Sequence, residues 1–391
     1  MVAIVSAVRT PIGKFGGALS NISAPDLGSI VIKSLLERAK CDAKEVDEVL
    51  MGNILQAGLG QGPARQAAIK AGLDVSVPAL SINNLCGSGL KAVNLGVAMI
   101  ESGQADVIIA GGMENMSAAP FLLNKARWGY RLGNGELIDS MLCDALIDAF
   151  DGCHMGITAE RIAKKYNISR KEQDEFAASS QQKAQKALQS QRFSDEIVPV
   201  KIPNKKGEDL ELREDEYPRA DVTAEGLASL KAVFDKNGTV TAANASGIND
   251  GAAALLLMSD TKAKKLGLKS MAQIIGTAST GVDPTIMGIG PVTAIQKCLN
   301  NSKLSLDQID LIELNEAFAA QSLAVCKELN LNQEIVNVNG GAIALGHPVG
   351  ASGARILVTL IHEMQKRQVT YGLASLCVAA AWAWRRLLKY K

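Results

Sequence analysis

Histidine and aromatic residues are scarce in this sequence, and its cysteines show no paired spacing. Three histidines and 4% aromatic residues occur in 391 positions, and none of the seven cysteines belongs to a C-x-x-C pair. A structural zinc site would need ligands from distant single positions, and a chain of this size does not need disulfide bonds to fold. We therefore expect free thiols and no metal site.

The chain also lacks an excess of charge of either sign and any long apolar run. Forty-one Lys and Arg residues face 40 Asp and Glu residues, which leaves a formal charge of +1. No basic stripe suits a phosphate backbone, so nucleic acid is not an expected partner. No apolar run approaches the ~18 residues of a membrane span, and the N-terminal sequence lacks the layout of a signal peptide. These absences predict a cytoplasmic protein without a membrane span.

Both ends of the chain alternate apolar, β-branched runs with helical patterns, which predicts an α/β fold. With 47% hydrophobic residues, the chain is long enough for two or three domains. The runs expected to form strands are residues 3–7, 49–51, 79–82, 107–110, 272–275, 311–314, 335–338 and 372–378.

The two ends resemble each other, which indicates an internal duplication. Residues 45–53 parallel residues 308–315, and in each half a short strand then runs through glycines into a helix and on to another apolar strand. The expected units are an N-terminal half at 1–117 and 247–265, an inserted domain at 118–246 and a C-terminal half at 266–391.

The inserted domain differs from both halves because it is rich in polar helices and charged loops. Ser169 and Glu172 form a capping box, which predicts a helix that runs to about Ser190. Residues 199–218 form a charged loop punctuated by prolines, and we expect most of its charges to be solvated.

Cys86 lies in the glycine-rich segment 84–90, where a predicted strand changes into a predicted helix. A helix N-terminus stabilises a thiolate, the form of cysteine that acts as a nucleophile. Gly87 and Gly89 permit a sharp turn and a close approach by a substrate or a second backbone. Without further support, an inert core thiol explains the segment equally well.

His347 occupies a second glycine-rich loop, residues 340–348, at the equivalent point of the second half. Pro348 restricts the backbone that follows it. Equivalent strand ends of a duplicated α/β fold converge on one crevice, so we expect His347 to lie within reach of Cys86 and to accept its proton.

Two further polar residues follow or close predicted strands of the second half. Asn315 comes after the strand 311–314, and its amide suits the binding of a water molecule. Cys377 closes the last expected strand and offers a second thiol. That thiol matters because a carbanion beside a thioester forms only with a base distinct from the acylated nucleophile. Neither residue would be informative alone.

Over nearly its whole length, the chain resembles the thiolase family, and most closely its acetyl-CoA acetyltransferase branch. The nucleophile signature of the family matches residues 83–90, its Asn-Glu-Ala-Phe-Ala motif matches 315–319, and its Gly-His-Pro motif matches 346–353. The resemblance implies a five-layered αβαβα fold of duplicated halves, an inserted loop domain that binds coenzyme A, and a homotetramer built as a dimer of dimers.

The resemblance also implies the catalytic roles. Cys86 is the acylated nucleophile, and His347 is its activating base and an oxyanion-hole donor. Asn315 holds an oxyanion-hole water, and Cys377 is the general acid and base. The backbone N–H groups of Cys86 and Ala379 form a second oxyanion hole.

The reaction that follows is a reversible condensation of two acetyl-CoA molecules to acetoacetyl-CoA and coenzyme A, through an acetyl-Cys86 intermediate. Coenzyme A thioesters are substrates, and no cofactor is implied. By the same resemblance, Met155 walls an acyl pocket that Met287 and Phe318 also line. His154 and Ser246 contact pantetheine. Arg219 lies by the adenine end.

Residues 378–391 depart from the ending that the family shows. After the second cysteine, the family reads Cys-x-Gly-Gly-Gly, then Met-Gly or Gln-Gly and a final apolar strand, whereas this chain continues Val-Ala-Ala-Ala-Trp-Ala-Trp-Arg-Arg-Leu-Leu-Lys-Tyr-Lys. Deleting one G after the first valine codon of a gene encoding Val-Gly-Gly-Gly-Met-Gly-Val-Ala-Ala-Ile-Ile-Glu gives residues 378–389. Our hypothesis is a one-nucleotide frameshift, which a gene sequence with incompatible codons would contradict.

The altered ending places Ala379 where the family has the first of its glycines. Alanine keeps the backbone N–H but adds a methyl group and loses access to positive φ. Since the loss of one oxyanion donor typically costs ~10²–10³-fold in rate, we expect reduced activity. An alternative interpretation makes the basic, aromatic tail a contact with a membrane surface or a partner.

Three other functions compete with this interpretation. A 3-ketoacyl-CoA thiolase of broader chain length uses the same residues. A decarboxylating β-ketoacyl synthase needs a second histidine, for which only His362 is available. A catalytically impaired, thiolase-like binding protein is compatible with the altered tail.

Overall fold

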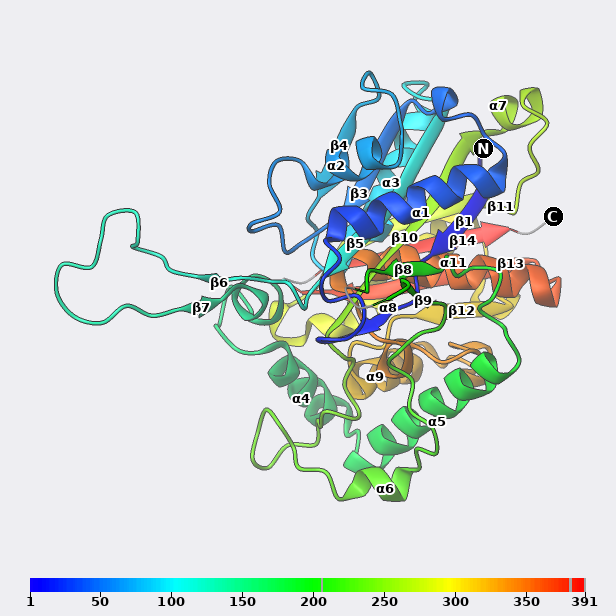
Figure 1. The fold of residues 1–391 in the computed structure, drawn as a ribbon. Helices are drawn as coiled ribbons and strands as arrows, with labels where there is room; N and C mark the ends of the chain where they lie inside the picture. Colours follow the sequence, from blue (N-terminus) through cyan, green and yellow to red (C-terminus); the bar gives the residue numbers. More distant parts are fainter. Residues whose placement is uncertain (205–206, 380–381, 390–391) are drawn as a thin grey trace.

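One mixed sheet runs through the protein, and its two ends repeat the same strand pattern (Figure 1). The computed structural model describes residues 1–204 and 207–379, together with the backbone of residues 382–389. The strands of the first half are β1 (Val2–Arg9), β10 (Asn249–Ser259), β5 (Val107–Asn115), β3 (Glu48–Gly52) and β4 (Ala79–Ile82). Those of the second half are β11 (Ala272–Gly281), β14 (Trp382–Lys389), β13 (Tyr371–Val378) and β12 (Leu311–Leu314).

The pairing pattern is the structural counterpart of the sequence repeat. In the first half, β3 pairs parallel with β4 and β5, and β5, β10 and β1 follow in antiparallel order. In the second half, β12 pairs parallel with β13, and β13, β14 and β11 follow in antiparallel order. A short antiparallel pairing between β1 and β11 joins the halves.

Helices cover both halves and fill the space between them, which gives the expected five layers (Figure 1). The outer helices are α1 (Ala24–Ala39) and α2 (Pro63–Lys70) on the first half and α8 (Gly290–Ser302) and α9 (Ala319–Leu329) on the second. The central layer consists of α3 (Ser88–Glu101) and α11 (Val349–Arg367), and α11 contacts strands of both halves. One hydrophobic core surrounds these two helices, and separate cores lie beneath the outer helices of each half.

The inserted segment packs against one end of this layered body and sends out a long arm, at the left of Figure 1. Its elements are β6 (Phe121–Leu122), β7 (Ile138–Asp139), α4 (Met155–Tyr166), α5 (Arg170–Gln189), β8 (Val200–Ile202), β9 (Leu210–Leu212) and α6 (Ala224–Ala228). The remaining elements are β2 (Gly13–Lys14), α7 (Asp260–Lys265) and α10 (Ala342–Leu345). Among the described residues, none of the helices combines the length and the apolar character that crossing a bilayer requires.

The capping-box prediction is confirmed at α5. The Ser169 hydroxyl accepts a hydrogen bond from the backbone N–H of Glu172, and the Glu172 carboxylate accepts one from the backbone N–H of Ser169. These reciprocal bonds satisfy two donors that would otherwise lack partners at a helix start.

A buried ion cluster attaches the inserted segment to β1. The Arg9 guanidinium donates to the carboxylates of Glu196 at 2.6 Å and Asp215 at 2.7 and 2.9 Å. Asp215 is thus an exception among the charges of the loop 199–218, most of which we expected to be solvated. Because burying these charges separately would be very costly, the pairing fixes the loop against the strand.

One central strand, β10, was not foreseen in the sequence. Its Gly-Ala-Ala-Ala-Leu-Leu-Leu-Met run has a high helix propensity, yet all but its last residue is buried between α1 and α11. A strand covered by helices on both faces shows no alternation of polar and apolar residues, so the usual pattern was absent.

The strand expected at residues 335–338 is wrong except for one bridge between Ile312 and Val336. Asn337 has a φ of 44°, and its side chain bonds both the N–H and the C=O of Leu314, at 2.8 and 2.7 Å. The side-chain amide therefore takes the place of the backbone ladder beyond Val336.

The two central helices touch near their first turns, through glycines. A Cβ on Gly89 of α3 would lie 2.7 Å from the Ala354 nitrogen, and a Cβ on Gly353 of α11 would lie 2.5 Å from the Leu90 nitrogen. Real Cβ atoms do not approach backbone so closely. Glycine at both positions therefore sets the distance between the two helices.

We predict that Gly353→Ala lowers the free energy of unfolding by ~1–3 kcal/mol, because the added methyl forces α3 and α11 apart. Urea unfolding measures the change. Gly226→Ala in α6 is the matched control, since its methyl would meet only the Thr223 hydroxyl at 3.4 Å. Equal unfolding midpoints for the two variants would contradict the prediction.

Candidate active site

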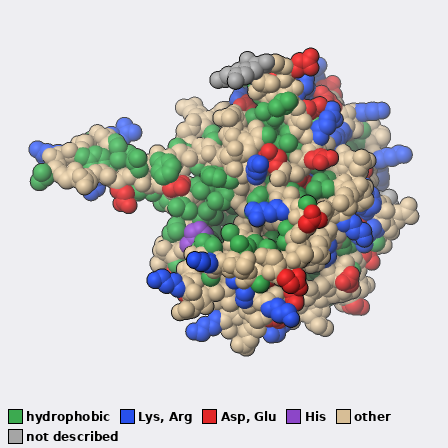
Figure 2. All heavy atoms as spheres, turned by 60° about the horizontal axis from the view of Figure 1, so that its bottom comes forward, with side chains coloured by type: hydrophobic (Ala, Val, Ile, Leu, Met, Phe, Trp, Pro, Cys, Tyr) green, Lys and Arg blue, Asp and Glu red, His purple; other side chains and the backbone are tan. Residues whose placement is uncertain are grey.

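A mostly apolar cavity of about 440 Å³ lies where the two central helices begin. Cys86, His347, Cys377 and Ala379 all line it, although they are separated by up to 293 positions in the chain, from 86 to 379. Figure 2 shows hydrophobic side chains gathered in a hollow at the base of the projecting arm, beside a histidine. The structure thus brings together four of the residues that the sequence singled out.

Cys86 lies between the end of β4 and the start of α3, as expected, and is partly buried. The tight turn is made by Leu85, whose φ is 49°, rather than by the glycines. The backbone N–H groups of Ala379 and of Cys86 itself lie close enough to the Cys86 sulfur to lower the pKa of the thiol. Two donors therefore converge on the sulfur.

The stabilisation that the helix start was expected to give the Cys86 thiolate is outweighed by burial in the resting protein. Burial raises the pKa of the Cys86 thiol to about 11, and the buried carboxylate of Glu114 acts in the same direction. The two N–H donors lower the pKa but do not compensate for desolvation. At neutral pH the sulfur is therefore protonated and needs a base.

His347 is held in the loop that leads into α11. Its backbone N–H donates to the Asn249 side chain at 2.9 Å, and its ring Nδ1 lies 2.6 Å from the Ser352 hydroxyl. Burial, with a smaller contribution from the charge of Arg355, lowers the pKa of His347 to about 3. The imidazole is therefore neutral and able to accept a proton.

Cys377 lies at the C-terminal end of β13, on the wall of the same cavity. Burial raises the pKa of the Cys377 thiol far above its usual range, and proximity to Cys86 adds to the effect. The two thiols are thus close enough to influence each other.

Ala379, which follows β13, belongs to the cavity wall and directs its N–H to Cys86. It is not among the non-glycine residues with positive φ in the described part of the chain. The expected cost of replacing glycine at a positive φ therefore does not arise, and the added methyl group is what distinguishes alanine here.

The backbone of the altered tail pairs on both sides in the sheet. As β14 it lies between β13 and β11, so it is not a free extension. The frameshift and surface-contact hypotheses concern side chains of residues 380–391, which lie outside the described residues.

Asn315 follows β12 but does not line the cavity. It is fully buried, and neither end of its side-chain amide has a hydrogen-bond partner among the described residues. Its neighbours Ala317 and Phe318 do line the cavity. A buried amide normally has a partner, which an ordered water can supply.

The residues expected to contact substrate also surround the cavity, with one exception. Its walls include His154, Met155, Ser246, Met287 and Phe318. Burial lowers the pKa of His154, so its ring is neutral at pH 7.

Arg219 is the exception, because it lines a smaller neighbouring cavity. Tyr217 and Ala242 border both cavities, so the two are adjacent. The Arg219 guanidinium lies 5.8 Å from the centre of the Tyr217 ring.

Phe234 is a cavity residue that the sequence did not reveal. Its ring stacks on His154 with centroids 4.5 Å apart and meets Phe318 edge to face at 6.4 Å. A single phenylalanine in a charged loop belongs to no sequence motif or periodic pattern, so its contact with His154 is visible only in the folded structure.

Glu114 was also missed, although it joins the two halves beneath the cavity. Its carboxylate accepts the backbone N–H groups of Ile54 and Leu55 from the first half and of Gly350 from α11, at 3.0 to 3.2 Å. Burial raises the pKa of Glu114 to about 7. Nothing in the strand sequence distinguishes this glutamate.

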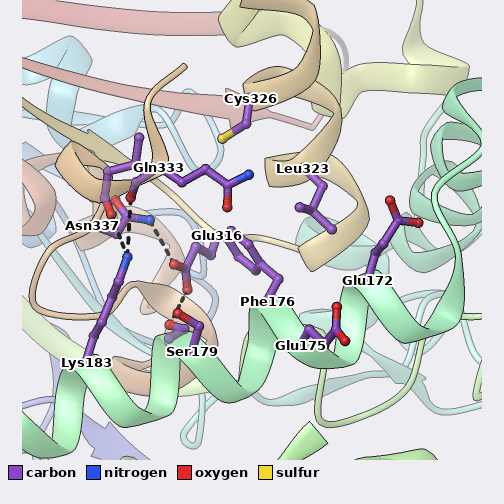
Figure 3. Close-up of a pocket in the computed structure, with 12 residues that line it drawn as sticks. Glu172, Glu175, Phe176, Ser179, Lys183, Glu316, Leu323, Cys326, Gln333 and Asn337 are labelled. Atoms are coloured by element: carbon purple, nitrogen blue, oxygen red, sulfur yellow. Dashed lines mark hydrogen bonds between the residues drawn. The ribbon is translucent and has the colours of Figure 1, made fainter. Parts of the chain in front are cut away.

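A second cavity, of about 310 Å³, lies between α5 and α9 (Figure 3). The Glu316 carboxylate accepts hydrogen bonds from Ser180 at 2.7 Å, Asn337 at 2.8 Å and the Ile343 N–H at 3.2 Å. These bonds connect α5 to the loop that precedes His347. Glu316 therefore supports the active-site loop from behind.

His362 takes no part in the cavity. It is buried in α11, and its Nε2 lies 2.9 Å from the Ala7 carbonyl of β1. The second histidine that a β-ketoacyl synthase needs is therefore not supplied by this residue. Within the described ranges, no group of three or more His, Cys, Asp or Glu side chains could hold a metal ion.

Comparison with known proteins identifies the family. The model of the thiolase N-terminal domain matches residues 2–261, and that of the thiolase C-terminal domain matches residues 268–389. The chain belongs to the thiolase family. The predicted resemblance is therefore confirmed.

Individual thiolase relatives cover almost the entire chain. An acetyl-CoA acetyltransferase of Pseudomonas aeruginosa is 59% identical over 377 residues, 96% of each chain. A protein of the same name from Escherichia coli is 59% identical over 376 residues, 96% of this chain and 95% of the relative. The crystal structure of the Bacillus anthracis acetyl-CoA acetyltransferase matches with a TM-score of 0.98 at 46% identity, covering 100% of this chain and 98% of that one. The expected thiolase fold is confirmed.

Proposed function

We propose that the chain is an acetyl-CoA C-acetyltransferase, which reversibly condenses two acetyl-CoA molecules to acetoacetyl-CoA and coenzyme A. The observation that carries the proposal is the convergence of Cys86, His347 and Cys377 on one apolar cavity. The bacterial relatives that share 59% of the sequence bear this name.

In the first half-reaction, the Cys86 sulfur attacks the carbonyl carbon of acetyl-CoA while its proton moves to Nε2 of His347. A new C–S bond forms, the C–S bond to coenzyme A breaks, and the departing thiolate takes the proton from His347. The N–H groups of Cys86 and Ala379, which face the sulfur, donate to the acyl oxygen as negative charge develops on it.

In the second half-reaction, the Cys377 thiol gives its proton to neutral His347, and the resulting thiolate removes an α-proton from a second acetyl-CoA. The enolate carbon bonds to the acetyl carbon on Cys86, and the bond from that carbon to the Cys86 sulfur breaks. The Cys86 thiolate then takes the proton from His347, which restores both thiols and the neutral imidazole. The raised pKa of Cys377 suits this step, because a thiolate that is costly to form is a strong base.

Asn315 is proposed to hold the water of the other oxyanion hole, together with His347. Its buried amide, without a partner among the described residues, supports this role. Asn315 itself does not line the cavity, whereas its neighbours Ala317 and Phe318 do, so a bridging water fits better than a direct contact with substrate.

A short acyl chain is proposed because bulky side chains close the cavity around the thiols. Met155, Met287 and Phe318 pack in one hydrophobic cluster with Cys377 and Ala379. An acetyl or acetoacetyl group fits against this wall, whereas the broader 3-ketoacyl chains of the alternative would displace it.

The coenzyme A arm is proposed to follow the cavity outwards. His154 and Ser246 would contact pantetheine, and Phe234 holds the ring of His154 by stacking. Arg219 would lie by the adenine end, because its small cavity adjoins the larger one at Tyr217 and Ala242.

A homotetramer built as a dimer of dimers is the proposed assembly. The projecting arm bears large exposed apolar side chains, including Trp128 at 85% and Leu132 at 99% exposure, which typically mark a protein contact. Strand β4 lies at the end of the sheet, where a second copy can pair. Light scattering in solution tests this proposal, and the mass of a single chain would contradict it.

We predict that Cys86→Ala blocks the first half-reaction, whereas Cys377→Ala slows the second. Cys86→Ala abolishes transfer of the acetyl group from labelled acetyl-CoA to the protein, because the acceptor sulfur is gone. Cys377→Ala still becomes labelled, but its condensation rate falls by ~10²–10⁴-fold because the base for the α-proton is lost.

Protein-bound label and the rate of acetoacetyl-CoA formation are the two measurements. Cys298→Ala, which removes a buried thiol outside the cavity, is the control and should leave both unchanged. Label retained by Cys86→Ala would contradict the assignment of the nucleophile.

The methyl group of Ala379 leads to a separate prediction. Ala379→Gly keeps the N–H that faces Cys86 and enlarges the cavity by one methyl group. We expect kcat/KM for 3-ketopentanoyl-CoA, relative to acetoacetyl-CoA, to rise by ~10-fold, the usual effect of one methylene in a pocket. Ala126→Gly on the projecting arm is the control, and an unchanged ratio in Ala379→Gly would show that the methyl does not limit chain length.

A further inference from the structure

The two ring nitrogens of His347 have different surroundings. Nδ1 lies 2.6 Å from the hydroxyl oxygen of Ser352, which is in the first turns of α11 and only 1% exposed. Since Ser352 occupies one side of the ring, Nε2 is the nitrogen available to the cavity that Cys86 also lines. The direction of the bond to Ser352 therefore decides whether Nε2 can accept a proton.

The hydroxyl of Ser352 has a single proton and two acceptors within reach. One is Nδ1, and the other is the Pro348 carbonyl at 2.9 Å, four residues earlier in the chain. If the hydroxyl donated to Nδ1, this group of atoms would contain one hydrogen bond. If Nδ1–H donates to the hydroxyl and the hydroxyl donates to the Pro348 carbonyl, the same atoms form two hydrogen bonds. Among the described residues, no other group donates a hydrogen bond to the Ser352 hydroxyl oxygen. Buried polar groups favour the arrangement that satisfies more of them.

We infer that Ser352 is a positioning residue that holds His347 with Nδ1 protonated, so that the lone pair of Nε2 faces the cavity and accepts the Cys86 proton. This inference rests on the proposed function. The same chain of bonds stabilises the imidazolium that forms, because Nδ1–H then becomes a charged donor to the Ser352 hydroxyl, which in turn donates a hydrogen bond to the Pro348 carbonyl.

The charges around Cys86 and His347 explain why His347 needs the hydrogen bond to Ser352. Arg355, on the same helix as Ser352, disfavours a positive His347, while Glu114, from β5, disfavours a negative Cys86. Cys377 on β13, His154 and Tyr217 are the other titratable groups that line the same cavity among the described residues. Proton transfer between Cys86 and His347 is therefore uphill, and a misplaced Nε2 proton would block it.

The alkylation of Cys86 by iodoacetamide, followed from pH 6 to pH 10, separates two paths in the full chain. The free thiolate reacts by one path, whose rate rises tenfold per pH unit because the pKa of Cys86 is about 11. The other path uses neutral His347 as the base and gives a plateau, because the pKa of His347 is about 3. The variants are Ser352→Ala and Ser352→Thr, with Ser322→Ala as control, a buried serine of α9 that lines neither cavity.

We expect Ser352→Ala to lower the plateau by ~10- to 100-fold while the rising limb stays unchanged. Ser352→Thr keeps a hydroxyl and should restore the plateau to within about threefold, and Ser322→Ala should match the unaltered chain. An unchanged plateau in Ser352→Ala overturns the inference, and so does an equal fall of plateau and limb, which would indicate a general structural role.

The same experiment distinguishes this inference from the proposed function. If the unaltered chain shows no plateau, His347 is not the base, and both its role and that of Ser352 are overturned. If the plateau is present and falls in Ser352→Ala, while acetoacetyl-CoA is neither formed nor cleaved, only the proposed function is overturned.

Discussion

The contact between α3 and α11 is the constraint on which the site depends. Cys86 lies just before one helix and His347 just before the other, so the distance between the two helices sets the distance between the proposed nucleophile and the proposed base. Gly89 and Gly353 permit a backbone approach that a single methyl group on either would prevent. Glu114 fixes the same junction from beneath by bonding N–H groups of both halves. The duplication thus provides two equivalent helix N-termini, and the glycines allow the backbones of the two helices to pack closely.

The burial that this contact creates determines the chemistry of the site. Removing water from the cavity raises the pKa of Cys86 and lowers the pKa of His347, so both are neutral before substrate binds. A neutral pair does not react with every electrophile at neutral pH. In the proposed mechanism, proton transfer is favoured when the N–H groups of Cys86 and Ala379 stabilise a developing oxyanion, which couples activation of the nucleophile to the presence of a thioester.

Site residues at repeated or motif positions could be predicted from the sequence. Residues whose role is to stack on or hydrogen-bond to another site residue could not. Cys86 and His347 could be paired because each lies in a glycine-rich loop before a helix in equivalent halves. Phe234 and Ser352 had no signal, since stacking on one ring or bonding another depends on segments that only the fold brings together. The residues around Asn337 look like a strand, but its side chain replaces the ladder. Strand β10 looks like a helix because burial on both faces removes the alternation that marks a strand.

The C-terminal strand β14 holds its place in the sheet through its backbone, although its sequence differs from the ending that the family shows. Strand β14 pairs with β13 and β11 through main-chain groups, which any residue other than proline provides. That pairing sets where β13 ends, and the turn after β13 directs the Ala379 N–H at Cys86. The N–H of Ala379 therefore lies beside Cys86 without a glycine at this position, and in the proposed mechanism its methyl group reduces the space for the acyl chain.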